Sequence, residues 1–90
     1  MFSSIGCETT KTFTQAEIEE ILSHFDTDCE TYGTILRAKG IVEGAEGTWL
    51  HFDYVPGEVN VRVGAPGVIG RICVIGTQLC EESIRALFGV

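Results

Sequence analysis

Residues 34–54, which read TILRAKGIVEGAEGTWLHFDY, decide the fold because they contain two strand patterns joined by a turn. Residues 34–42 and 48–54 are rich in residues that favour extended backbone. The five residues between them, EGAEG, include two glycines that can adopt positive φ in a tight connection. The pattern therefore predicts an antiparallel hairpin.

Side chains alternate between the two faces of a strand, so this stretch also predicts which residues share a face. On the first strand, one face is expected to carry Leu36, Ala38, Gly40 and Val42, and the other Ile35, Arg37, Lys39 and Ile41. On the second strand, the two sets are Thr48, Leu50, Phe52 and Tyr54 against Trp49, His51 and Asp53. The small residues of the first set leave room for a helix to pack closely.

Two further strands follow the hairpin. Residues 55–58, VPGE, fit a type II turn, and the alternating valines of residues 59–63 predict a half-buried strand after it. Residues 71–76 are nearly all apolar, which predicts a strand in the middle of the sheet that is covered on much of both faces. Residues 2–7 are a possible first strand.

Two helices are predicted, one before and one after these strands. The sequence Thr14-Gln15-Ala16-Glu17 matches a capping box, and the helix after it has an apolar stripe of Ile18, Ile21, Leu22 and Phe25. The second helix is expected over residues 81–88, with Cys80 at its N-cap and Gly89 ending it. In that helix Glu81 can pair with Arg85.

Together these elements predict a single α+β domain over residues 1–90. We expect a two-layer sandwich in which two helices pack on one face of a mostly antiparallel sheet of four or five strands. The other face of the sheet is then free for a partner.

Composition and charge exclude several classes of function. The net charge of −7 argues against nucleic acid and anionic membranes as partners, because phosphate binding requires a surplus of Lys and Arg. No stretch approaches the ~20 apolar residues that span a bilayer, and residues 1–7 do not resemble a signal peptide. We therefore expect a cytoplasmic protein with four free cysteines.

The sequence lacks the motifs of common catalytic sites. There is no GxxxxGK[ST] phosphate loop, no GxSxG motif, and no Cys placed beside a His. We expect no catalytic residues in this chain, and so no enzymatic activity of its own.

The candidate binding residues lie on the predicted strands. Arg37 and Lys39 leave one strand face together, which suits an anionic partner, but cross-strand pairing with Asp53 or Glu58 is the alternative. Arg62 and Arg71 could enlarge this basic patch if their strands lie alongside. Trp49 is either an exposed aromatic anchor or a cover for strand edges.

Two clusters could bind a metal ion. His51 and Asp53 leave one strand face together, but two ligands do not complete a site, so a solvated or hydrogen-bonded His51 is the alternative. His24 precedes Asp26, Asp28 and Cys29 at the end of the first helix, where a polar helix terminus is the alternative interpretation.

Several short motifs in this order resemble the CobW C-terminal domain family. The family shows an RxKG strand, a GRxxxIG-like strand and a helix of LxxxxIxxxF type. The corresponding residues here are Leu36-Arg37-Ala38-Lys39-Gly40, Gly70-Arg71-Ile72-Cys73-Val74-Ile75-Gly76, and Leu79 with Ile84 and Phe88. The segment Phe13-Thr14-Gln15-Ala16-Glu17-Ile18 resembles the family's opening, so the resemblance spans nearly the whole chain.

In that family the domain follows a P-loop GTPase domain of cobalamin-synthesis-type metallochaperones. The resemblance implies that GTP, magnesium and a transition metal, zinc or cobalt, belong to the full-length protein, with no cofactor in this chain. It implies an accessory domain whose open sheet face contacts the GTPase domain, a client metalloprotein or another copy. Arg37, Lys39 and Arg71 are the contact residues that it suggests.

Two other hypotheses remain open at this point. The chain could be a small metal-binding domain that uses His51, Asp53 and the cysteines. It could also be a homo-oligomer joined through its sheet edges or its open face.

Overall fold

The computed structural model describes residues 1–90, and nearly all of them lie in strands or helices or in the short connections between them. The elements, in chain order, are β1 (Ser3–Thr9), β2 (Thr12–Phe13), α1 (Gln15–Thr27), α2 (Cys29–Tyr32), β3 (Thr34–Gly44), β4 (Trp49–Val55), β5 (Glu58–Gly64), β6 (Gly70–Thr77) and α3 (Glu81–Phe88).

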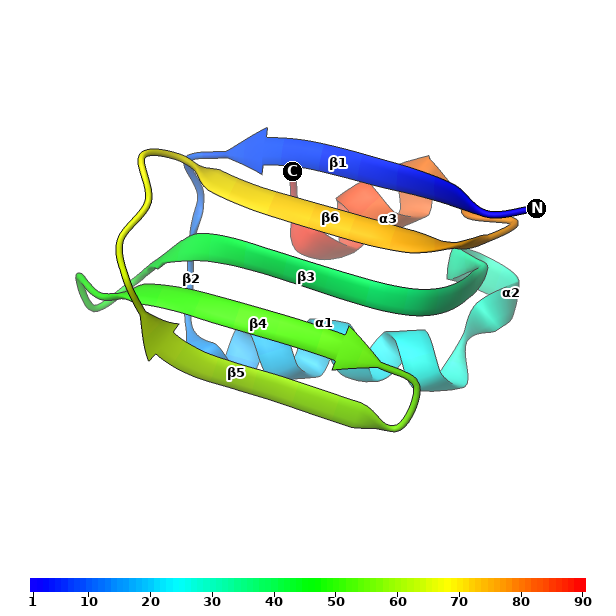
Figure 1. The fold of residues 1–90 in the computed structure, drawn as a ribbon, viewed down its shortest axis with the longest axis horizontal. Coiled ribbons are helices and arrows are strands. Elements are labelled where there is room, and N and C mark those ends of the chain that lie inside the picture. Colours follow the sequence, from blue (N-terminus) through cyan, green and yellow to red (C-terminus); the bar gives the residue numbers. More distant parts are fainter.

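The strands form one open sheet in the order β1-β6-β3-β4-β5, and all of these neighbours are antiparallel. The short strand β2 pairs in parallel with the end of β3. The helices lie behind the sheet on one face, and nothing covers the other face (Figure 1). The predicted α+β sandwich is therefore confirmed, with the short elements β2 and α2 in addition to those expected.

The side chains of β4 divide between the two faces as the alternation predicts. At the start of β3 the alternation is interrupted. The register with β6 shifts between Ile35 and Arg37, so Leu36 is an extra residue in a β-bulge. Consequently Ile35 is buried at 2% exposure and Leu36 is 38% exposed, the reverse of the prediction. From Ala38 onward the predicted faces hold.

Two other strands are less covered than predicted. Strand β6 lies within the sheet as expected, but its side chains are buried on one face only, because no helix covers the face that carries Arg71 and Ile75. Strand β5 lies at the edge of the sheet, where Val59 and Val63 are exposed and Val61 is half-buried. Burial on both faces would require a second helical layer, which the chain does not supply.

Both predicted helices begin where the sequence indicates. The amide of Glu17 donates to Thr14 Oγ1 over 3.1 Å, and the amide of Thr14 donates to Glu17 Oε1 over 2.9 Å, which completes the capping box of α1. Helix α3 begins after Cys80 and ends at Gly89, whose φ of 79° is the left-handed conformation of a helix C-terminus. The predicted ion pair between Glu81 and Arg85 is 3.0 Å long.

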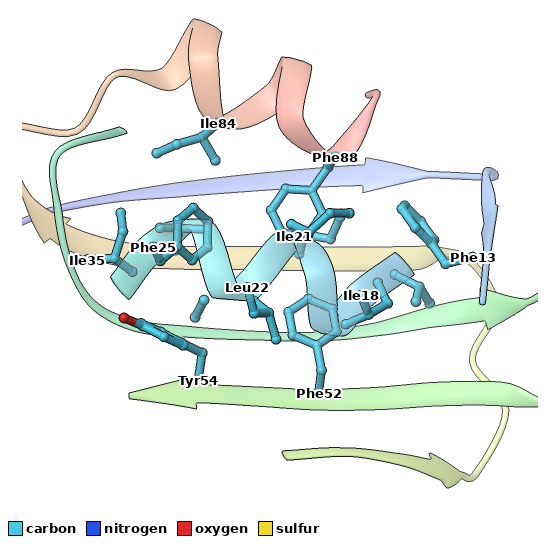
Figure 2. Packing of buried hydrophobic residues seen from close by; sticks show 14 of the residues in the cluster. Phe13, Ile18, Ile21, Leu22, Phe25, Ile35, Phe52, Tyr54, Ile84 and Phe88 are labelled. Atoms are coloured by element: carbon cyan, nitrogen blue, oxygen red, sulfur yellow. The ribbon is translucent and has the colours of Figure 1, made fainter. Parts of the chain in front are cut away.

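Aromatic rings join the sheet to both long helices. Phe52 of β4 stacks on Phe88 of α3 with ring centroids 6.1 Å apart, and Phe25 of α1 contacts Phe88 and Tyr54 at 6.3 and 5.7 Å (Figure 2). Such contacts add about 0.5–1.5 kcal/mol per pair beyond the burial of area. This cluster fixes the helices against the sheet and leaves the opposite face open.

A hydrogen-bonded carboxylate ties α1 to the β4–β5 turn. Asp26 accepts from the hydroxyl of Tyr54 over 2.7 Å and from the amide of Gly57 over 2.9 Å. The Gly57 amide, followed by the Tyr54 hydroxyl, lowers the pKa of Asp26. Burial, followed by the bond to Asp26, raises the pKa of Tyr54, so the phenol remains a donor.

We expect Tyr54→Phe to reduce the free energy of unfolding at neutral pH by about 1–2 kcal/mol, because it removes a hydrogen bond to a charged acceptor.

Since the pKa of Asp26 is depressed in the fold, the stability that its carboxylate contributes is present above its unfolded pKa of about 4 and is lost as pH falls through the folded value. Urea unfolding between pH 7 and pH 2 should therefore show a shallower loss of stability in Asp26→Asn. An acid profile identical to that of the original chain would contradict this assignment.

We expect Gly40→Ala to destabilise the fold by about 1–3 kcal/mol, because a Cβ there would overlap the Phe52 ring and approach the Arg71 carbonyl oxygen at 2.8 Å. Gly6→Ala is the matched control, since a Cβ at Gly6 meets nothing within 4 Å. In this control stability should be unchanged or rise by up to about 1 kcal/mol. Equal thermal shifts in the two variants would show that the Phe52 contact is not the cause.

Candidate protein-docking face

The sheet face opposite the helices, here called the open face, brings together side chains from five strands. Cross-strand register places Lys39 opposite both Cys73 and Asp53, and Ile41 opposite both Arg71 and His51. The side chains that define the face are Glu8, Arg37, Lys39, Ile41, Glu43, Trp49, His51, Asp53, Glu58, Asn60, Arg62, Arg71, Cys73 and Ile75. The six candidate binding and metal residues of the predicted strands, at positions 37, 39, 49, 51, 53 and 71, therefore all lie on one face.

Asp53 lies between two guanidinium groups. Its carboxylate is 2.8 Å from Arg62 Nη1 and 3.7 Å from Arg37 Nη2, and Arg62 also donates to Asn60 Oδ1 over 3.0 Å. Cross-strand pairing, the alternative considered for Arg37, is thus present. Because these groups are partly exposed, each ion pair contributes at most about 1 kcal/mol.

Lys39 has no such partner, although Asp53 is its direct cross-strand neighbour. Arg71 pairs with Glu8 over 3.4 Å, and Lys11, on the other layer, donates to the carbonyl of Phe88. Lys39 is the one basic side chain of the chain that makes neither an ion pair nor a hydrogen bond. Its ammonium group is therefore available to a carboxylate from another molecule.

A shallow hollow lies beside Lys39. Gly6 contributes no side chain to it, and Glu8, Arg71, Cys73 and Ile41 surround it. No sequence motif indicates this hollow, because it depends on the pairing of β1 with β6, which joins residues near the two ends of the chain.

Apolar side chains lie among these charges. Ile41 and Ile75 are 38% and 37% exposed, respectively. Trp49 is half-buried, and its ring lies beside Gly67 of the β5–β6 connection. A face that combines exposed aliphatic groups, an aromatic edge and arginines has the composition of a protein contact surface.

The net charge of the chain is distributed unequally between the two layers. Of 13 acidic and six basic residues, the open face carries Glu8, Glu43, Asp53 and Glu58 together with Arg37, Lys39, Arg62 and Arg71. The open face is thus neutral. The remaining nine acidic and two basic residues, on the helices, their flanking segments and the β3–β4 turn, account for the whole charge of −7.

The residues of the first possible metal site have other partners. His51 Nε2 is 2.8 Å from the carbonyl oxygen of Ala65, and Asp53 binds the two arginines. Of the cysteines, Cys73 alone shares their face. Burial raises the pKa of the Cys7 thiol, whereas hydrogen bonds from Ser83 lower that of Cys80 on the helix side.

The second possible metal site, around His24, is likewise divided among structural contacts. His24 lies 3.7 Å from Glu20, Asp26 accepts the Tyr54 bond, and Asp28 caps α2 through the amide of Thr31. Nowhere in the chain do three His, Cys, Asp or Glu side chains converge as metal ligands would. The donor set of this chain therefore does not fit a bound transition metal.

Comparison with known proteins agrees with the resemblance noted above. The chain matches the family described as "Cobalamin synthesis protein cobW C-terminal domain" over residues 2–90. The chain belongs to this family. Among curated proteins, none matches it.

Two solved structures show how this CobW C-terminal domain relates to a larger protein. The Zn(II)-bound YjiA GTPase from E. coli superposes with a TM-score of 0.77 at 27% identity, and a Zn(II)-bound triple mutant of YjiA with 0.78 at 27%. Each match covers 98% of this chain but 29% of the GTPase chain.

None of the helices has the length and hydrophobicity that a transmembrane helix requires.

We expect the purified chain to bind zinc and cobalt weakly, because no third ligand joins His51 and Asp53. In calorimetric titration in reducing buffer, the binding free energy should be far below the roughly 10–16 kcal/mol of a structural zinc site. His51→Ala should leave the titration unchanged. Tight binding at a simple ratio that His51→Ala abolishes would instead restore the metal-binding hypothesis.

Proposed function

We propose that this chain is the accessory docking domain of a cytoplasmic CobW-type GTPase that handles a transition metal, and that the open face contacts the GTPase domain. The observation that carries the proposal is the combination of a neutral, partly apolar sheet face with a net charge of −7 that lies entirely outside that face, on the helix layer and the β3–β4 turn. A partner can approach the open face without meeting net repulsion, and it can bury Ile41 and Ile75 there.

The proportions of the related protein support this choice of partner. The matched domain is 29% of the YjiA chain, so most of that GTPase lies outside the region that this chain resembles. Exposed aliphatic groups flanked by arginines are typical of the faces by which domains of one protein contact each other. Lys39, which has no partner within this domain, would receive a carboxylate from the GTPase domain.

The chemistry of the proposed protein is assigned to its other domain. This sequence has no phosphate-binding loop, and its His, Cys, Asp and Glu side chains do not converge as metal ligands. GTP, magnesium and the transition metal, which is zinc in the related YjiA structures, would be bound by the GTPase domain. A client metalloprotein is the alternative occupant of the open face.

The proposal is tested by titrating the cognate GTPase domain with this chain, with GTP, GDP or no nucleotide present. We expect saturable binding, and we expect Arg37→Glu combined with Lys39→Glu to weaken it by tenfold or more, because both cations become repulsive toward an acidic partner. Lys39→Glu combined with Glu46→Lys distinguishes the effect of the charge at position 39 from the effect of the net charge of the chain, because the net charge stays at −7.

Glu46→Lys alone, in the β3–β4 turn, is the control and should bind as the original chain does. An absence of binding in every nucleotide state would reject the GTPase domain as partner. Binding that responds equally to Glu46→Lys and to Lys39→Glu would reject the open face as the contact.

A further inference from the structure

The free edge of β5 is a second feature of the molecule that is suited to binding. Strand β5 pairs with β4 without interruption from Glu58 to Gly64, and no strand lies on its other side. It contains no proline and no bulge, the usual devices that protect an edge strand from pairing with another chain. The one side-chain hydrogen bond to this edge is a long one of 3.5 Å from Gln15 Nε2 to the carbonyl oxygen of Val61, and α1 itself packs against β5 on the helix side of the sheet.

The hairpin geometry shows which backbone groups are free. Val55 and Glu58 close a two-residue turn, so they form a hydrogen-bonded pair. Counting from Glu58, every second residue of β5 therefore directs its N–H and C=O groups toward β4. The residues between them, Val59, Val61 and Val63, direct their N–H and C=O groups away from the sheet. The contact between Gln15 and the carbonyl of Val61 agrees with this direction.

The side chains of these same residues form an incompletely covered apolar stripe. Val59 and Val63 are 38% and 62% exposed, respectively, on the helix side of the sheet. The opposite edge, β1, carries serine, glycine and glutamate at most of its positions and offers no such stripe. Free backbone groups beside exposed valines are the features that allow an added strand to bind.

We propose that β5 pairs antiparallel with β5 of a second copy of this chain, with the two-fold axis at Asn60. In this register Val59 and Val61 exchange backbone hydrogen bonds with Val61 and Val59 of the second copy. Glu58 then lies opposite Arg62 of the second copy, and the same ion pair forms twice by symmetry.

Charge complementarity favours this register over the neighbouring one. If the axis passed through Val61, Glu58 would face Gly64 and Asn60 would face Arg62, and no directly opposed ion pair would form. Arg62 binds Asp53 through Nη1 and retains further donors for Glu58 of the second copy. Because the axis is perpendicular to the sheet, both open faces point to the same side of the dimer and remain free for the partner proposed above.

Sedimentation velocity across a range of protein concentrations tests the proposal on the 90-residue chain itself. We expect a reversible monomer–dimer equilibrium. Glu58→Arg and Arg62→Glu should each weaken it about tenfold, since each creates two opposed like charges, and the double reversal should restore it. Val61→Pro should abolish dimerisation and leave the β4 ladder intact, because it removes an outward donor only.

Controls separate this interface from a general effect of charge. Glu46→Arg changes the net charge by the same amount as Glu58→Arg and should leave the dimer unchanged. Asn60→Cys should form an intermolecular disulfide, since directly opposed residues of a non-hydrogen-bonded pair lie about 4.5 Å apart. Cys29 and Cys80 of the original chain give the background, and Glu46→Cys is the matched cysteine variant.

A chain that remains monomeric at the highest concentration, with circular dichroism confirming the fold, would overturn the proposal. So would a dimer that is insensitive to Val61→Pro, or a double reversal that fails to restore association while both single variants are folded. These outcomes are distinguishable from failure of the proposed function, because GTPase docking is tested at Arg37 and Lys39 of the central strand β3 in a titration with the GTPase domain, whereas dimerisation is tested on the edge strand β5 with this chain alone.

Discussion

The contact of the Phe52 ring with the backbone of β3 at Gly40 is the constraint on which the rest of this structure depends. Only a residue without a side chain leaves room for the ring there. Once seated, Phe52 stacks on Phe88 of α3, and Phe88 contacts Phe25 of α1, which in turn contacts Tyr54. The two long helices are thus positioned from a single point in the middle of the sheet.

Because both helices pack on that side, the chain has no element left to cover the other face. The 16 residues of the core cluster lie between the sheet and the helices, and the outward side chains of the same strands meet solvent. This one-sided arrangement also separates charge. The helices expose most of the acidic residues, whereas on the open face four carboxylates and four cations cancel.

The pairing on the open face also explains why Lys39 differs from its neighbours. Asp53 could bind Lys39, its direct cross-strand neighbour, but its oxygens are taken by Arg37 and Arg62. One carboxylate thus serves two guanidiniums, and the remaining cation has no partner within the domain. The chain belongs to the CobW C-terminal domain family, and the matched region is 29% of the YjiA GTPase chain, so the GTPase domain of the proposed function could supply that partner.

The sequence by itself determined the hairpin of β3 and β4, the capping box and apolar stripe of α1, and which side chains share a face along a single strand, such as Arg37 with Lys39 and His51 with Asp53. These features depend on residues close together in the chain, where the periods of 2.0 and 3.6 residues apply directly. Tertiary structure alone decided the bulge at Leu36, the exposure of one face of β6, and the triad of Arg37, Asp53 and Arg62. Each of these depends on which strands become neighbours, and that choice is made by packing among residues far apart in sequence.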